Sequence, residues 1–179
     1  NDGAADSAAA TVSITVLPLG RPEADDQSVA TDEDTPLEIT LTGSDPDGDP
    51  LSYVIDSPPA NGTLVDNGDG AWTYTPNADY HGPDNFTFHV NDGELDSASA
   101  TVSITINPIN DAPTADDQSV VTDEDTPLLI TLTGSDVDGD ALSYAIDSLP
   151  AHGTLADNGD GTWTYTPEFN YFGPDSFTF

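Results

Sequence analysis

The sequence predicts an all-β protein made of tandem seven-stranded sandwiches with Greek-key connections. Short runs of alternating apolar and polar residues are bounded by Gly, Pro, Asn and Asp, which is typical of half-buried strands. No stretch shows the period of about 3.6 residues that marks an amphipathic helix. The chain also repeats itself at an offset of 91 residues, so that Trp72 matches Trp163 and Phe88 matches Phe179. Small β domains arranged in tandem account for all three observations.

Seven strands are expected in the complete repeat. Their ranges are residues 27–31, 37–41, 51–55, 62–65, 72–74, 86–90 and 102–106. The second run illustrates the pattern, because Leu37, Ile39 and Leu41 alternate with Glu38 and Thr40. The stretch DNGDG at residues 66–70 has the composition of a hairpin turn. The aromatic residues of the fifth and sixth runs are predicted to lie in the core, because a sandwich buries one face of each strand.

The repeat also predicts three parts of the chain. Residues 1–17 correspond to the end of a preceding repeat, residues 22–107 to a complete repeat, and residues 113–179 to a repeat without its last strand. The segment ATVSITV at residues 10–16 matches ATVSITI at residues 100–106. An incomplete sandwich exposes an apolar groove and unpaired backbone groups. We expect residues 10–16 to complete the second repeat of a neighbouring copy, or to be the trace of a longer continuous chain. A frayed N-terminal tail is the alternative.

Composition excludes several classes of partner and chemistry. The chain has 34 Asp and Glu against one Lys or Arg, a formal net charge of −33. We therefore expect no nucleic acid as partner, because phosphate binding needs basic residues. No apolar run approaches the roughly 18 residues of a membrane span, so membrane insertion is not expected either. The absence of Cys excludes disulfides and thiolate chemistry. An apolar content of 35% argues against a disordered acidic chain.

The acidic residues gather in loops that alternating strand directions would place at the two ends of each sandwich. Glu33, Asp34 and Asp79 belong to one end. The opposite end carries Asp45, Asp47 and Asp49 in the first repeat and Asp136, Asp138 and Asp140 in the second. In a tandem array, the first of these ends faces the opposite end of the next repeat across the linker residues Asn110 and Asp111. So many carboxylates repel one another unless a cation lies between them, and calcium prefers such oxygen ligands.

Turn formation alone is the alternative explanation of these Asp-Gly clusters. It is the preferred one for DNGDG, since a tight hairpin needs those residues. For the SDxDGD loops beside an Asn-Asp linker we prefer metal binding. The loops are not EF-hands, because Gly48 and Gly139 stand at the fourth position and not at the sixth.

Five motifs together resemble the bacterial cadherin-like tandem repeats of very large secreted adhesins. They are NDAP, DEDTP, SDxDGD, NGDGTWTYTP and FGPDSFTF. The resemblance implies an Ig-like or cadherin-like sandwich, calcium at the joints, and a role as an extension arm at the cell surface or in a biofilm matrix. Carried over by position, the implied calcium ligands are Glu33, Asn110, Asp111, Asp136 and Asp138.

The first joint departs from this pattern, because it carries Gly20 and Arg21 where the second carries Asn110 and Asp111. Arg21 is the single Lys or Arg of the chain. We expect its guanidinium to lie within salt-bridge reach of the loop at residues 45–49, so that this joint binds fewer calcium ions. A solvated arginine is the alternative.

Three functions remain open at this stage. The first is a calcium-stiffened extension segment, the second is a subunit of an extracellular filament joined by strand complementation, and the third is a module that binds a cell-surface glycan or protein. An enzyme is not expected, because the acidic motifs are duplicated and His81, His89 and His152 do not recur between repeats. The loop pair Tyr80-His81 and Tyr171-Phe172 is the one candidate for a binding surface that differs between the repeats.

Overall fold

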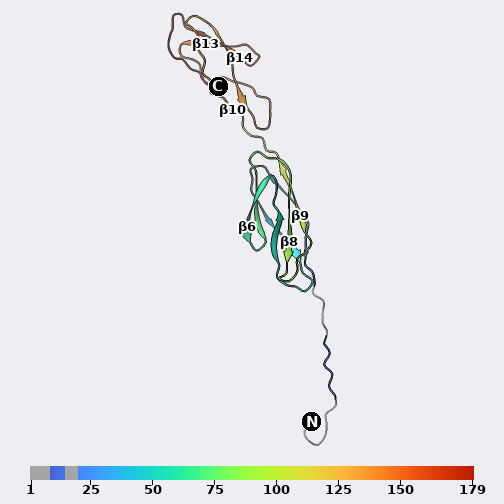
Figure 1. The fold of residues 1–179 in the computed structure, drawn as a ribbon. Helices are drawn as coiled ribbons and strands as arrows, with labels where there is room; N and C mark the ends of the chain where they lie inside the picture. The colour runs from blue at the N-terminus through green and yellow to red at the C-terminus, as the bar shows by residue number, and fades with distance from the viewer. Residues whose placement is uncertain (1–8, 15–19) are drawn as a thin grey trace. The chain divides into compact units, whose positions relative to one another are not determined.

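The computed structural model describes residues 9–14 and 20–179, and the all-β prediction is confirmed. The chain divides into two compact units, residues 1–108 and residues 109–179 (Figure 1). Within the described ranges, no helix is long and apolar enough to span a membrane. Residues 9–14 form no strand, and the side chains of Val12 and Ile14 are 83% and 82% exposed. Thr15 and Val16 of the predicted segment 10–16 lie outside the described residues.

The first unit is a sandwich of two sheets. One sheet has the order β2 (Gln27–Asp32), β9 (Ala100–Asn107), β8 (Gly82–Asn91) and β5 (Ser52–Ser57). The other has the order β3 (Leu37–Thr40), β7 (Ala71–Pro76) and β6 (Gly62–Gly68). β2 runs parallel to β9, and the other neighbours are antiparallel. These strands overlap the seven predicted runs, and the chain passes between the sheets at several connections, as a Greek key requires.

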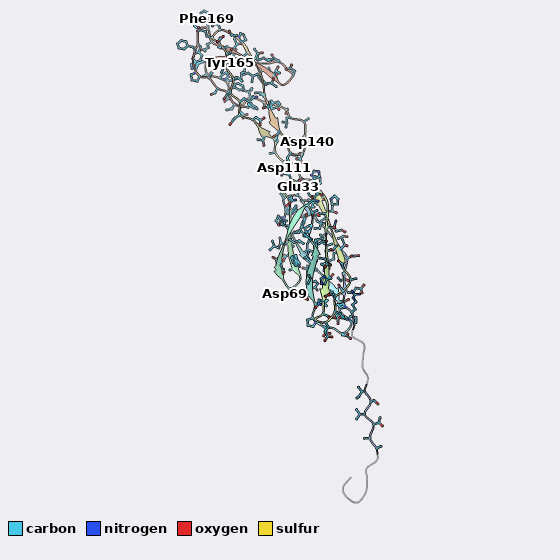
Figure 2. All side chains as sticks on the ribbon, in the orientation of Figure 1. Glu33, Asp69, Asp111, Asp140, Tyr165 and Phe169 are labelled. Atoms are coloured by element: carbon cyan, nitrogen blue, oxygen red, sulfur yellow. The ribbon has the colours of Figure 1, made fainter. Side chains whose placement is uncertain are left out.

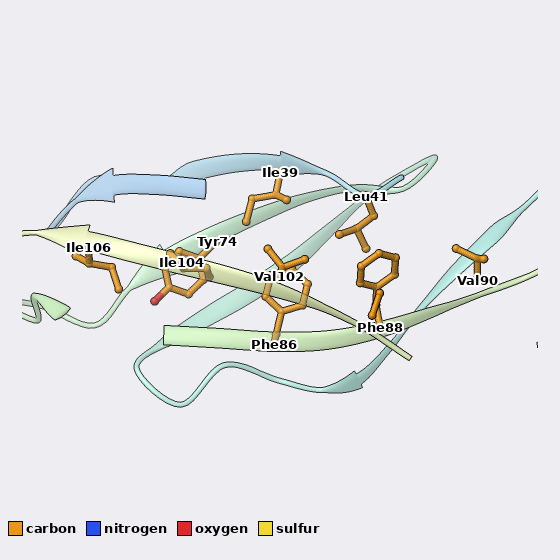
Figure 3. Packing of buried hydrophobic residues seen from close by; sticks show 10 residues of the cluster. Ile39, Leu41, Tyr74, Phe86, Phe88, Val90, Val102, Ile104 and Ile106 are labelled. Carbon is orange, nitrogen blue, oxygen red and sulfur yellow. The ribbon is translucent and has the colours of Figure 1, made fainter. Parts of the chain in front are cut away.

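The core of this unit lies between the two sheets (Figure 3). The second sheet supplies Tyr74 and Ile39, and the first supplies Phe86, Phe88 and Ile104, all at most 2% exposed. Within each strand, the buried residues alternate with exposed ones because successive side chains point to opposite faces. The prediction that these aromatic residues form the core is therefore confirmed for Tyr74, Phe86 and Phe88.

A buried carboxylate joins the two sheets at one point. Asp84 is 5% exposed and accepts hydrogen bonds from the hydroxyl of Tyr74 at 2.8 Å and from the backbone N–H groups of Ala60 and Asn61 at 3.0 and 2.9 Å. Burial and this carboxylate raise the pKa of Tyr74 well above its usual value. The network satisfies a charge that would otherwise be costly to bury, and it fixes the loop between β5 and β6.

The second unit contains a complete counterpart of one of the two sheets of the first unit. β11 (Leu128–Thr131), β14 (Thr162–Pro167) and β13 (Gly153–Asp157) form a three-stranded sheet that corresponds to β3, β7 and β6. The short pair β10 (Thr114–Ala115) and β12 (Gly134–Ser135) corresponds to the pair β1 (Glu23–Ala24) and β4 (Gly43–Ser44). The hydroxyl of Tyr165 donates to Asp175 at 2.9 Å, as Tyr74 does to Asp84.

The other sheet of the second unit is incomplete. Its residues 118–123 and 173–179 correspond to β2 and β8, but in the described part of the chain they form no ladder, apart from one bridge between Ser148 and Thr178. No described strand takes the place that β9 has in the first unit. Only Ile130 and Leu132 are fully buried among the described large apolar residues of this unit. The described residues of the second repeat therefore form one complete sheet and only part of the other.

Candidate metal-binding ends of the two units

Two acidic loops meet at one end of the first unit. The backbone N–H of Asp79, in the loop after β7, donates to Oδ1 of Asp34, in the loop after β2, at 3.2 Å. Both residues have a positive φ of 56°, a conformation that Asp tolerates better than most residues. Glu33 lies at this end and Asp69 lies at the opposite end of the same unit (Figure 2). The structure therefore places Glu33, Asp34 and Asp79 at one end of the sandwich and the DNGDG turn at the other, as the sequence predicts.

Glu33 is held firmly at its end of the sandwich. Its backbone N–H donates to the carbonyl of Asn107, the last residue of β9, at 2.9 Å. Its residue surface is 4% exposed, and its Oε2 lies 3.7 Å from Nδ1 of His81. A carboxylate this deeply buried needs cationic or hydrogen-bonding partners, since an ion loses its hydration on burial. The position therefore suits a group that binds a cation.

The opposite end of the first unit carries the loop of Asp45, Asp47 and Asp49. Oδ1 of Asp45 accepts hydrogen bonds from the backbone N–H groups of Asp47 at 2.8 Å and Asp49 at 3.2 Å. Gly48 has a φ of 80°, which lets the loop close around Asp45. Oδ2 of Asp45 is buried and has no hydrogen-bond partner among the described residues. This oxygen is available to a small cation.

The corresponding loop of the second unit is joined to the linker. The backbone N–H of Asp111 donates to Oδ2 of Asp138 at 2.8 Å, and the side-chain amide of Asn110 donates to the carbonyl of Asp111. Oδ1 of Asp136 accepts from the backbone N–H of Asp140 at 3.1 Å. Within this unit the structure therefore brings four predicted acidic residues into one loop-and-linker cluster with Asn110, where the carboxylates of Asp136 and Asp138 accept backbone hydrogen bonds. Their assignment as calcium ligands remains a prediction.

The two linkers differ by one residue, and the structure shows which one. The backbone N–H of Gly20 donates to Oδ2 of Asp47 at 2.6 Å, so Gly20 stands where Asp111 stands in the second unit. The counterpart of Asn110 is therefore the missing residue, and Arg21 corresponds to Ala112. The linker of the first unit keeps the backbone contact and lacks the carboxylate.

The expectation for Arg21 is wrong. Its Nε donates to the backbone carbonyl of Asp96 at 2.7 Å, in the loop between β8 and β9. Among the described residues, no carboxylate lies within the 4.0 Å of a salt bridge to its guanidinium. The reason is its place in the chain. Gly20 already contacts the loop of Asp47, and the next residue is directed to the neighbouring loop.

Comparison with protein families decides the identity of the two units. Residues 20–108 match the bacterial cadherin-like domain, and residues 110–179 match the bacterial Ig domain. The chain belongs to the bacterial cadherin-like and Ig-like repeats. The resemblance drawn from the five sequence motifs is confirmed, and the sandwich of the cadherin-like unit has the fold that it implied.

Individual relatives of these repeats are much longer proteins. The chain is 34% identical over 134 residues to the integrin beta-like protein A of Dictyostelium discoideum, a match that covers 64% of this chain and 7% of that protein. It is similar to protocadherin gamma B2 extracellular cadherin domains 3–6, at 17% identity and a TM-score of 0.46, over 84% of this chain and 39% of that one. It is also similar to an endo-fucoidan hydrolase of glycoside hydrolase family 107, at 26% identity and a TM-score of 0.43, over 88% of this chain and 26% of that one.

Besides the Asp84 network, the cadherin-like unit contains another polar cluster that the sequence did not indicate. Oδ1 of Asp56 lies 2.6 Å from Nδ1 of His89, and the hydroxyl of Ser99 donates to Oδ2 of Asp56 at 2.6 Å. The Ser99 hydroxyl, followed by His89, holds the pKa of Asp56 below its usual value. The carboxylate stands between the other two groups, so this is not the order of a catalytic triad, in which the imidazole contacts the hydroxyl. The three residues come from β5, β8 and the loop before β9, which sequence spacing does not relate.

Proposed function

We propose that this chain is a non-catalytic, calcium-stiffened extension segment of a secreted, extracellular adhesion protein of the cell surface or biofilm matrix. The observation that carries the proposal is the set of carboxylates fixed by backbone N–H groups in the Ig-like unit. Asp136 and Asp138 are both held in this way, and Asp138 is held by the linker residue Asp111 itself. Hydrogen bonds of this kind orient the carboxylates before an ion arrives, which lowers the cost of binding.

The chemistry of this donor set fits calcium. Calcium takes about six to eight oxygen ligands from carboxylates, amide carbonyls and backbone carbonyls. The Ig-like unit offers Asp111, Asp136, Asp138 and Asp140 with the side chain of Asn110, and the cadherin-like unit offers Glu33, Asp34 and Asp79. A cation also relieves repulsion in a chain with a formal net charge of −33.

Chain connectivity supports the sharing of an ion by both units. The backbone of Glu33 is bonded to Asn107, and the backbone of Asp111 is bonded to the loop of Asp138. Asn107 and Asp111 are four residues apart, so their Cα atoms are separated by at most about 14 Å. We propose that calcium ions in this interval take ligands from both units and thereby restrict their relative motion.

The family relationship supports an adhesive and extracellular role. The cadherin-like and Ig-like matches cover residues 20–108 and 110–179, and the integrin beta-like relative carries an adhesion name. We propose that the chain belongs to the extended repeat region of such a protein and not to a catalytic or ligand-binding domain, because the acidic motifs are duplicated.

Calorimetry of the whole chain tests the proposal. Calcium binds the folded ends and not the unfolded chain, so free calcium at about 100 times its dissociation constant should stabilise folding by about 2.7 kcal/mol. The melting temperature should rise in calcium and fall back in EDTA. Because so acidic a chain is stabilised by any cation through screening, magnesium and sodium chloride at matched ionic strength are the controls. An equal shift in magnesium and in calcium would contradict a specific site.

A binding module is the second candidate, and one feature of the Ig-like unit favours it. Phe169 and Phe172 are 83% and 85% exposed in the loop after β14, and the rings of His152 and Tyr171 stack at 4.2 Å beside them. In the cadherin-like unit, Ala78 corresponds to Phe169 and His81 corresponds to Phe172. Exposed rings suit a glycan or protein surface. A glycan array in which the F169A/F172A variant loses all signals of the unmodified chain would support this candidate.

A further inference from the structure

The imidazole of His89 lies between two carboxylates that come from different elements of the cadherin-like unit. Its Nδ1 is 2.6 Å from Oδ1 of Asp56 on β5, and its Nε2 is 3.7 Å from Oδ1 of Asp96 in the loop between β8 and β9. Among the described residues, no other carboxylate lies within 4.0 Å of the ring. The His89 side chain is 22% exposed, so water and salt screen these contacts only in part.

Protonation of His89 reverses the sign of its contact with Asp96. A neutral imidazole carries one N–H, and when Nδ1 donates to Asp56, Nε2 turns a lone pair toward the carboxylate of Asp96. The imidazolium carries an N–H at both nitrogens, so each nitrogen then faces a carboxylate of opposite charge. The uptake of one proton therefore replaces repulsion between β8 and the loop of Asp96 with attraction.

Both carboxylates are held in place by other groups. The hydroxyl of Ser99 donates to Oδ2 of Asp56 at 2.6 Å, and the side-chain amide of Asn91 donates to Oδ1 of Asp96 at 2.7 Å. The Ser99 hydroxyl, followed by His89, lowers the pKa of Asp56, so this carboxyl stays ionised in the range in which an imidazole takes up its proton. The proton is therefore bound by the ring and not by Asp56.

The loop that carries Asp96 also holds the linker. The backbone carbonyl of Asp96 accepts a hydrogen bond from Nε of Arg21 at 2.7 Å. The other acidic residues of this loop are Asp92 and Glu94. Oδ1 of Asp92 accepts from the backbone N–H groups of Glu94 and Leu95 at 2.7 and 2.6 Å, so this carboxylate closes the loop on itself. The position of Asp96 therefore sets the position of the carbonyl to which the linker is bonded.

We propose that His89 is a proton-dependent clamp, which in its protonated form bridges Asp56 and Asp96 and thereby orders the loop and its hydrogen bond to Arg21. Imidazole is the side chain that changes its charge between about pH 5 and 8. The stability that the clamp contributes is present in mild acid and is lost as the pH rises and the ring releases its proton. None of these four residues is a proposed calcium ligand, so the clamp operates with or without calcium.

Arg21 supplies a unique reporter of the clamp, because the chain has no other Lys or Arg. Nitrogen-15 NMR of the full chain in EDTA measures how fast the Nε–H of Arg21 exchanges with water. His89→Gln removes the charge of the ring and keeps a donor for Asp56. Exchange in the unmodified chain should be about two- to fivefold slower than in His89→Gln at about pH 5.5, and equally fast at about pH 8. Because the chains are compared at equal pH, the intrinsic pH dependence of exchange cancels. A ratio that is the same at both pH values would overturn the proposal.

Asp96→Asn is a second and milder variant. The side chain is exposed and its amide oxygen still accepts the hydrogen bond from Asn91, while the charge that faces His89 is lost. Urea denaturation followed by the fluorescence of Trp72, with Trp163 replaced by Phe, measures the stability of the cadherin-like unit. Asp96→Asn should lower this stability at about pH 5.5 and not at about pH 8, where a neutral ring has no use for the charge.

Glu38→Gln is the matched control for net charge. Glu38 is exposed on β3 of the other sheet, and its replacement removes the same single negative charge from an acidic chain. Asp96→Asn should be less stable than Glu38→Gln in mild acid, and the difference should disappear when His89→Gln is present in both. A difference between the two variants that does not change with pH would refute the proposal, and so would one that persists without His89.

Discussion

The backbone N–H of Asp111 donates a hydrogen bond to Oδ2 of Asp138 over 2.8 Å, which holds the linker on the loop after β12. The cadherin-like unit has the same contact between Gly20 and Asp47 at 2.6 Å. The two linkers thus share a backbone geometry and differ in whether the linker residue carries a carboxylate. This difference leads to predictions about calcium at each linker.

Asp138→Asn should weaken calcium binding without breaking the linker contact. The amide oxygen of Asn still accepts the hydrogen bond from Asp111, while the charge that attracts calcium is lost. We expect the calcium affinity measured by titration calorimetry to fall by about tenfold or more, because affinity follows the charge of the ligand set. Asp160→Asn, in the hairpin turn between β13 and β14, is the matched control and should bind as the unmodified chain does. Equal affinity for the two variants would exclude Asp138 as a ligand.

Gly20→Asp should make the first linker dependent on calcium. A Cβ at Gly20 would lie 2.8 Å from Oδ2 of Asp47, and the new carboxylate adds a like charge beside it. The variant should therefore melt at a lower temperature than the unmodified chain in EDTA and recover more of the loss in calcium. Gly20→Ala introduces the same Cβ without the charge, so it should be destabilised without this recovery. Equal recovery of both variants would contradict the expectation.

Tyr74→Phe should destabilise the cadherin-like unit more than Tyr165→Phe destabilises the Ig-like unit. Tyr74 donates to the buried carboxylate of Asp84, and loss of a hydrogen bond to a charged group costs about 1.5–3 kcal/mol. Tyr165 makes the same bond at a partly exposed site, where water replaces the hydroxyl. Each unit contains one tryptophan, Trp72 or Trp163, so urea denaturation followed by fluorescence in Trp→Phe backgrounds separates the two transitions. A larger loss for Tyr165→Phe would be inconsistent with the difference in burial.

Ser99→Ala should raise the pKa of Asp56 and reduce stability at neutral pH, and the difference from the unmodified chain should vanish in strong acid. The Ser99 hydroxyl is the main cause of the lowered pKa of Asp56, with His89 second. A carboxyl group whose folded pKa is lowered contributes stability above its unfolded pKa of about 3.8, and this is lost as the pH falls through the folded pKa. Carboxyl carbon NMR of the full chain measures the shift directly. Ser103→Ala on the exposed face of β9 is the control and should leave the titration of Asp56 unchanged.

The sequence predicts the strands of the cadherin-like unit well, because one face of each is buried and the alternation is visible. The run Leu37 to Leu41 shows this, since Ile39 and Leu41 are both 2% exposed. The pairs β1–β4 and β10–β12 were not predicted, because two residues are too few to show an alternation. The carboxylate of Asp84 was also missed. Its partners lie on two separate segments, residues 60–61 and Tyr74, that only the tertiary structure brings to it.

The candidate site is predictable in its residue types and less so in its contacts. The contact between Asp34 and Asp79 follows from the alternation of strand direction, which places their loops at one end. The orientation of Arg21 does not follow from charge. A nearby backbone carbonyl, that of Asp96, competes with carboxylates for an exposed guanidinium, whose ion pairs contribute little in water. Because Gly20 contacts the loop of Asp47, Arg21 is one residue further along the linker and contacts the carbonyl of Asp96.

The most direct test of the central claim is the distribution of distances between the two units with and without calcium. Spin labels at Val65→Cys in the cadherin-like unit and Leu149→Cys in the Ig-like unit sit on exposed side chains of a chain without native cysteine. Pulsed electron resonance should give a broad distribution in EDTA and in magnesium and a narrow one in calcium, and Asp138→Asn should shift the narrowing to higher calcium. Labels at Val54→Cys and Val65→Cys within one unit should not respond. A distribution between the units that is the same in calcium and in EDTA would contradict the account.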